Sequence, residues 1–282
     1  SKGLPFVLGQ FGSNSTYTQT RTNWAAGMDA KAKLQEIAAK DLGGAPGDYD
    51  TSDGKVFNKA NPSKSMSWAQ AAKRAIELGG KYSGKEMPKD LNPITKWATA
   101  GIAGTGLVGV TKDKRPKKGV TPGLVTAFVK VEVDTETGKV EVLEHVEVAD
   151  CGTAVHPQSL ATQIKGGAVM GYGMALSERY VFDPKLGMSL NGSLHNSRPR
   201  TILDVPSEMT VTNVDKPDTS NPVGAKGVGE PVQGAATAAI LVAISDALGG
   251  HMFNRTPVVP DMIINAAAGR PQSYKPLAVN TQ

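Results

Sequence analysis

Cysteine is almost absent from this chain, which has one, Cys151, in 282 residues. A single cysteine excludes an intrachain disulfide, and it excludes an all-cysteine metal or iron–sulfur site built by this chain alone. The four histidines are scattered, at 145, 156, 195 and 251, without paired metal-ligand spacing. If a metal is used, we therefore expect that no side chain of this polypeptide ligates it.

Aromatic residues are also few, at 5% of the chain, so a stacking platform for nucleic acid is not expected. The net charge of +5 is mild, and the densest basic run, at 112–118, has the composition of a solvated loop. No apolar run approaches the roughly 18 residues of a membrane span, and no signal peptide opens the chain. We therefore predict no nucleic-acid partner, no membrane span and a cytoplasmic protein, with the periplasm as the alternative.

Helix and strand patterns interleave without a regular βαβ rhythm, which favours an α+β fold. Apolar alternation over 124–133, a turn at 134–138 and a second alternating run at 139–148 predict a β-hairpin. Residues 81–122 have little periodicity and are expected to form a long irregular excursion. Helices are predicted over 23–40, over 67–78 behind a Ser67/Gln70 capping box, over the glycine-rich 160–177 and over 232–248, and a short antiparallel strand is predicted over 208–213.

The most informative motif is the loop NPVGAKGVGEP at 221–231. Its three glycines (224, 227 and 229) should let the backbone adopt unusual angles and approach another group closely. Pro231 suits the first position of the helix that follows. Glu230 then lies at or beside the N-cap, where the helix dipole stabilises negative charge. A carboxylate held there, next to backbone N–H groups, is typical of a general base or an anion site, and the alternative is an ordinary acidic helix cap.

Four collinear segments, at 9–16, 129–142, 149–178 and 225–249, carry a resemblance. They read GQFGSNST, VKVEVDTETGKVEV, ADCGTAVHPQSLATQIKGGAVMGYGMALSE and AKGVGEPVQGAATAAILVAISDALG. Together they resemble the molybdenum-binding subunit of the xanthine oxidase family of molybdenum hydroxylases. The resemblance implies that residues 1–282 form the second molybdopterin-binding domain of such a subunit.

Only the second half of such a subunit is matched, since the family's first-half cofactor motifs are missing. The opening Ser1-Lys2-Gly3-Leu4-Pro5 also reads like the interior of a longer sequence. We therefore expect a processed product or a separately encoded piece. Its implied partners are a chain carrying the first half, an iron–sulfur subunit with [2Fe–2S] and a subunit with FAD.

The resemblance also implies a reaction, hydroxylation of an electron-poor carbon with oxygen from water, in which Glu230 is the catalytic base. The substrate stays open among an aldehyde, an N-heterocycle, an aromatic thioester and carbon monoxide, because the substrate residues lie in the missing half. The alternative from a different class is a non-catalytic structural or cofactor-handling subunit.

The implied cofactor is molybdopterin in its cytosine dinucleotide form, with molybdenum held by the pterin dithiolene. His156 replaces a usual asparagine and Asn14 replaces a common arginine, so the nucleotide contacts differ in detail. The alternatives are a buried small hydrophobe for Cys151, a surface loop for 10–16, a tight turn for 227–229, and ordinary surface or capping histidines for His195 and His251. The residues implied to bind the cofactor are Gln10, Phe11, Gly12, Ser13, Asn14, Thr16, Asp150, Cys151, His156, Gln163, Lys226, Gly227, Val228 and Gly229.

Overall fold

The computed structural model describes residues 9–115 and 122–274, and its contacts divide them into two compact units. The first unit holds residues 9–11, 15–115 and 220–222, and the second holds 12–14, 122–219 and 223–274. The extent of the domain, 1–282, stays a prediction. The opening residues 1–5 and the end of the predicted basic run, at 116–118, lie outside the described residues.

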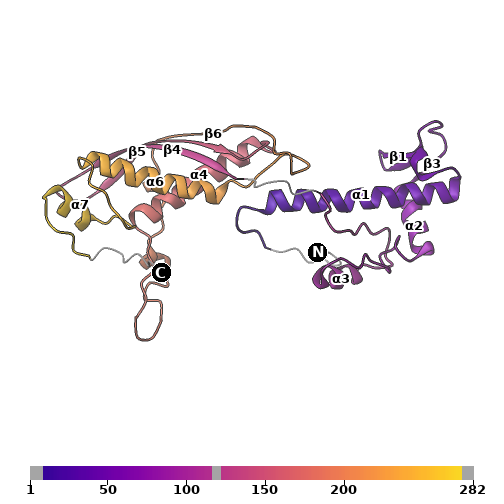
Figure 1. Ribbon diagram of the computed structural model, residues 1–282, viewed down its shortest axis with the longest axis horizontal. Coiled ribbons are helices and arrows are strands. Elements are labelled where there is room, and N and C mark those ends of the chain that lie inside the picture. The colour runs from indigo at the N-terminus through magenta and orange to yellow at the C-terminus, as the bar shows by residue number, and fades with distance from the viewer. Residues whose placement is uncertain (1–8, 116–121, 275–282) are drawn as a thin grey trace. The chain divides into compact units, whose positions relative to one another are not determined.

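The first unit is built around one long helix, α1, which packs on a small antiparallel sheet and on α2 (Figure 1). The sheet has the order β1-β2-β3. Its core joins apolar side chains of α1, such as Ile37, to Tyr49 and Val56 of the sheet. The elements are α1 (Ser15–Leu42), a 3-10 turn (Pro46–Asp48), β1 (Tyr49–Ser52), β2 (Lys55–Asn58), β3 (Ser65–Ser67), α2 (Trp68–Leu78) and α3 (Pro93–Ala100).

Two predictions for this unit need correction. Helix α1 begins at Ser15 rather than at 23. Its polar first turns are held by tertiary contacts, including the ion pair of Arg21 Nε with Asp113 Oδ2 at 2.7 Å. Residues 81–122 are not wholly irregular, because Asn92 caps α3 by accepting the Thr95 N–H at 2.7 Å. The capping box that opens α2 is confirmed, with both of its hydrogen bonds present.

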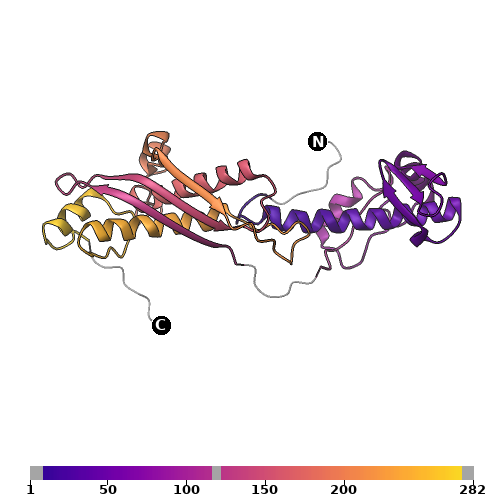
Figure 2. The ribbon, with the colours of Figure 1, turned by 90° about the horizontal axis from the view of Figure 1, so that it is seen from above.

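The second unit has two layers, with helices α4 and α6 side by side on one face of a sheet of order β4-β5-β6 (Figures 1 and 2). The α+β prediction is confirmed, as is the hairpin of β4 and β5. The bounds are β4 (Leu124–Val133), β5 (Val140–Asp150), α4 (Pro157–Leu176), α5 (Leu194–Ser197), a 3-10 turn (Ile202–Asp204), β6 (Glu208–Asn213), α6 (Gly229–Ala247) and α7 (Pro260–Ala267).

Strand β6 occupies the predicted residues but pairs parallel with β5, so the antiparallel prediction is wrong for this strand. The cause is the connection, because α4 crosses between the two strands and a parallel pair needs such a crossover. None of the described helices is long and apolar enough to cross a membrane.

The glycines of α4 lie where it packs on α6. A β-carbon on Gly171 would lie 2.7 Å from that of Ala236, and one on Gly167 would collide with the Gly229 carbonyl oxygen. The expectation that a partner packs very close to this helix is therefore confirmed. Close backbone contact compensates for the low helix propensity of glycine, and it places Gly167 and Gly171, in the second half of α4, against the first half of α6.

Candidate functional site

Glu230 lies in the first turn of α6, which begins at Gly229. Pro231 is therefore the third helical residue, not the first as predicted. Val228 stands at the N-cap and has no side-chain hydrogen bond there. The start of α6 thus lacks a capping group of its own, and its exposed N–H groups need acceptors from elsewhere.

Residues 12–14, far away in sequence, supply one of these acceptors. The Ser13 hydroxyl accepts the backbone N–H of Glu230 at 2.9 Å. In return, the Gly12 N–H donates to Glu230 Oε1 at 3.2 Å. Among the described residues, no hydrogen-bond partner is found for the second carboxylate oxygen, and the side chain is exposed. Glu230 is thus held at one oxygen and open at the other, as a proton acceptor should be.

The glycines of the loop serve different purposes. Only Gly224 has a positive φ, of 75°, so the expectation of unusual angles is wrong for Gly227 and Gly229. Gly227 is needed for close approach, because a β-carbon there would collide with the Ser13 carbonyl oxygen. Gly229 has neither constraint, and the nearest atoms to a β-carbon there are 3.6 Å away.

Lys226 joins this loop to the end of β5. Its ammonium pairs with Asp150 Oδ2 at 2.8 Å and donates to the Pro122 carbonyl at 3.0 Å. The hydrogen bond from Lys226 holds the pKa of the Asp150 carboxyl below its usual range. The Lys226 backbone N–H also donates to the Cys151 carbonyl at 2.7 Å. These bonds fix the loops at 150–152 and 224–227 against each other.

The side chain of Cys151 is buried, and burial raises the pKa of its thiol. This packing matches the alternative of a small buried hydrophobe. A contact of Cys151 with the cofactor stays a prediction.

His156 caps α4. Its Nδ1 accepts the Ser159 N–H at 3.1 Å. The ring nitrogen thus does at this N-cap what the side-chain oxygen of asparagine does at others. Gln163 is also exposed on α4, and its Oε1 would lie 3.6 Å from a β-carbon on Gly229.

The second unit therefore brings together most of the predicted site residues. Gln10, Phe11 and Thr16 belong to the first unit, where all three are exposed, so the structure does not join them to this group. Asn14 belongs to the second unit and is exposed. The sequence reasoning missed two participants, the Pro122 carbonyl and Gly152, which bridges to Ala225 at a φ of 70°.

The site is a cluster of backbone donors. Within the described residues, no acceptor is found for the N–H groups of Gly227, Val228 and Gly229, which lead into α6. Successive free N–H groups at a helix N-terminus bind phosphate. No group of three or more His, Cys, Asp and Glu side chains able to hold a metal occurs in the described part of the chain. The free N–H groups therefore fit an anionic ligand such as a phosphate group.

Comparison with known proteins decides the family. The family described as "Molybdopterin cofactor-binding domain" matches residues 1–206. The chain belongs to this family. The resemblance to molybdenum-binding subunits of the xanthine oxidase family is confirmed by relatives as well. The aldehyde oxidoreductase molybdenum-binding subunit PaoC of Escherichia coli (strain K12) is 27% identical over 241 residues. The carbon monoxide dehydrogenase large chain of Hydrogenophaga pseudoflava is 28% identical over 246 residues.

The match covers most of this chain but little of its relatives. It spans 86% of this chain and 28% of the Escherichia coli subunit. A solved structure of Cu,Mo-CO dehydrogenase matches 94% of this chain and 31% of its own chain, with a TM-score of 0.66 and 25% identity. The chain therefore spans less than a third of the length of these family members.

Proposed function

We propose that the second unit binds the pyrophosphate of a molybdopterin dinucleotide, in the cytosine form, and presents Glu230 as the base of a hydroxylation. When bound, the cofactor supplies oxygen transfer from water and takes up the electrons of the substrate. The observation that carries the proposal is the position of Glu230, which directly follows the three residues with free N–H groups, Gly227 to Gly229.

The protein residues divide this work. The N–H groups of Gly227, Val228 and Gly229 bind the anionic end of the cofactor. The Gly12 N–H holds Glu230 Oε1, which leaves Oε2 to accept the proton. The ion pair of Lys226 with Asp150 holds the two loops against each other, which keeps the carboxylate and the N–H groups in fixed positions.

The proposed substrate is an aldehyde or an N-heterocycle, in line with relatives named aldehyde oxidoreductase and nicotine 6-hydroxylase, the latter from Paenarthrobacter nicotinovorans and 33% identical over 141 residues. The proposed partners are the first half of the molybdenum subunit, a [2Fe–2S] subunit and an FAD subunit. The alternative, a non-catalytic structural or cofactor-handling subunit, does not need Glu230 as a base.

The test is Glu230→Gln in the assembled enzyme, assayed with benzaldehyde and quinoline. The amide keeps the shape but cannot take a proton, so kcat should fall by several orders of magnitude while molybdenum content stays unchanged. Glu208→Gln is the matched control, because Glu208 is an exposed glutamate at the start of β6. Wild-type kcat in Glu230→Gln with full molybdenum would favour the non-catalytic alternative, and a wild-type enzyme without molybdenum or pterin would refute the proposal.

A further inference from the structure

A buried polar cluster lies between β5 and α4 in the second unit. It consists of His145 and Glu147 on β5 and Tyr172 on α4, whose exposed fractions are 0%, 0% and 1%. Residues two apart on a strand point to the same face, so His145 and Glu147 both face the helix layer. Tyr172 meets them there, with its ring centroid 5.5 Å from that of His145. None of these side chains takes part in the proposed function.

Most polar atoms of this cluster have no partner. His145 Nε2 and Glu147 Oε2 lie 3.0 Å apart. His145 Nδ1, Glu147 Oε1 and the Tyr172 hydroxyl are buried, and no hydrogen-bond partner is found for them among the described residues. Nearly all buried polar atoms in native proteins are paired, because an unpaired one keeps the full cost of its removal from water. Three such atoms on neighbouring side chains indicate a bound group that can donate and accept hydrogen bonds.

The Tyr172 hydroxyl and the Glu147 carboxyl act on each other. Burial raises the pKa of the hydroxyl, and the negative charge of Glu147 raises this pKa further. Because the interaction between charges weakens with distance, the two groups are neighbours within the core. The strands beside β5 supply no polar side chain to them, since the cross-strand partners of His145 and Glu147 are all apolar: Val129 and Ala127 on β4, and Met209 and Val211 on β6.

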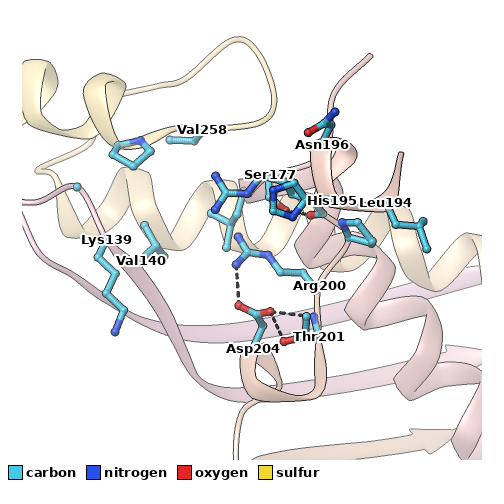
Figure 3. A pocket seen from close by; sticks show the side chains of 15 residues that line it. Lys139, Val140, Ser177, Leu194, His195, Asn196, Arg200, Thr201, Asp204 and Val258 are labelled. Atoms are coloured by element: carbon cyan, nitrogen blue, oxygen red, sulfur yellow. Dashed lines mark hydrogen bonds and ion pairs between the residues drawn. The ribbon is translucent and has the colours of Figure 1, made fainter. Parts of the chain in front are cut away.

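Tyr172 also forms part of the wall of a cavity of about 460 Å³, together with Val142 and Leu143 of β5. The ion pair of Arg200 with Asp204, drawn in Figure 3, lines this cavity as well as the larger cleft shown there. Since one water molecule occupies about 30 Å³, the cavity has room for several. Water is therefore available directly beside the Tyr172 side chain.

We propose that His145, Glu147 and Tyr172 form a binding site for an ordered water molecule inside the second unit. A buried water makes two to four hydrogen bonds, and it can both donate and accept them. It therefore suits His145 Nδ1 in either tautomer of the ring, the hydroxyl of Tyr172 and the Oε1 atom of Glu147. The water gives these three atoms their missing partner, and it joins β5 to α4 by hydrogen bonds within a core that is otherwise apolar.

A metal ion suits the cluster less well. A structural zinc site has four side-chain ligands, whereas this cluster offers one imidazole, one carboxyl and one phenol. The described part of the chain contains no group of three or more His, Cys, Asp and Glu side chains able to hold a metal. The imidazole and the carboxyl are also bonded to each other.

A crystal structure of the assembled enzyme, at a resolution that shows ordered water, tests the proposal directly. We expect a water oxygen at about 2.7–3.2 Å from the unpaired atoms of His145, Glu147 and Tyr172. An empty space there, a metal ion, or direct hydrogen bonds that pair these atoms with other protein groups would overturn the proposal.

Tyr172→Phe in the assembled enzyme gives a second measurement, by hydrogen exchange of the backbone amides of β5 and α4. Loss of a hydroxyl that is bonded to the water should raise their exchange about 2- to 10-fold, the effect of one hydrogen bond. Loss of an unpaired hydroxyl would leave exchange unchanged or slow it, and this result would contradict the proposal.

Tyr49→Phe is the matched control. Tyr49 is fully buried in the first unit, where its hydroxyl donates to the Gly43 carbonyl at 2.6 Å. This variant should leave the exchange of β5 and α4 unchanged. The water site and the proposed function can fail separately, because a cluster without water in an enzyme that loses turnover with Glu230→Gln overturns the water site alone.

Discussion

The hydroxyl of Ser13 accepts the backbone N–H of Glu230 at 2.9 Å across 217 positions of sequence. Ser13 thereby does for α6 what its own N-cap residue, Val228, cannot do. With the Gly12 N–H on Glu230 Oε1, the contact is reciprocal, in the manner of a capping box whose two halves come from distant segments. The candidate base is therefore held by residues from near the beginning of the chain.

Ser13→Ala tests this contact. Loss of a capping hydroxyl costs about 1 kcal/mol of stability, and without it we expect Glu230 to lose orientation, so that kcat falls while molybdenum content stays unchanged. Ser13→Gly should show the same loss, although glycine suits the φ of 48° at this position. Unfolding by urea and steady-state kinetics measure the two effects.

The matched control for Ser13 is Ser159→Ala, at the start of α4, because Ser159 bonds to His156 Nδ1 through its backbone N–H and not through its hydroxyl. Wild-type kcat and wild-type stability in Ser13→Ala would show that the hydrogen bond from the Glu230 N–H to the Ser13 hydroxyl supports neither catalysis nor folding.

Gly227→Ala and Gly229→Ala form a second test. A methyl group on Gly227 meets the Ser13 carbonyl oxygen, so the loop must move and the N–H groups lose their positions. We expect molybdenum content of the purified enzyme to fall severely. A methyl group on Gly229 has no atom nearer than 3.6 Å, so this variant should keep its molybdenum. Equal retention in both variants would contradict the role of close approach.

A buried polar cluster in the second unit predicts a pH dependence. His145 and Glu147 of β5 are fully buried, with Nε2 and Oε2 3.0 Å apart, and Tyr172 of α4 packs beside them. His145 Nδ1, Glu147 Oε1 and the Tyr172 hydroxyl have no partner in the described structure. Burial raises the pKa of the Glu147 carboxyl, even though the hydrogen bond from His145 opposes the shift.

The direction of the pH dependence follows from the difference in proton affinity of Glu147 between the folded and unfolded states. The folded state holds the Glu147 proton more tightly than the unfolded state does, so this group destabilises the fold as pH rises from the unfolded pKa, near 4.5, through the raised folded pKa. Glu147→Gln stays neutral, so its free energy of unfolding should fall less over this interval. Urea titrations of both proteins from pH 4 to pH 8 measure the difference. The prediction would be contradicted if the free energies of unfolding of the two proteins changed in parallel with pH. It would also be contradicted if the wild type became more stable relative to Glu147→Gln as pH rises.

The sequence by itself determined the features that depend on neighbouring residues. Period-two alternation predicted the hairpin of β4 and β5, and the Ser67/Gln70 pair predicted the start of α2. The glycines of α4 predicted a closely packed partner. Each of these patterns involves residues that lie close together in the sequence, where side-chain periodicity and helix capping act. The assignment of Glu230 as base came from the resemblance and stays a prediction.

Only the tertiary structure decided the rest. The same local pattern allows β6 to pair in either direction, and the crossover through α4 makes it parallel. Three loop glycines look alike in sequence, yet only Gly227 faces the Ser13 carbonyl. The orientation of Glu230 likewise depends on Gly12 and Ser13. Pairing direction, close approach and a distant cap are contacts between segments that fold together, and the spacing of residues along one segment does not encode them.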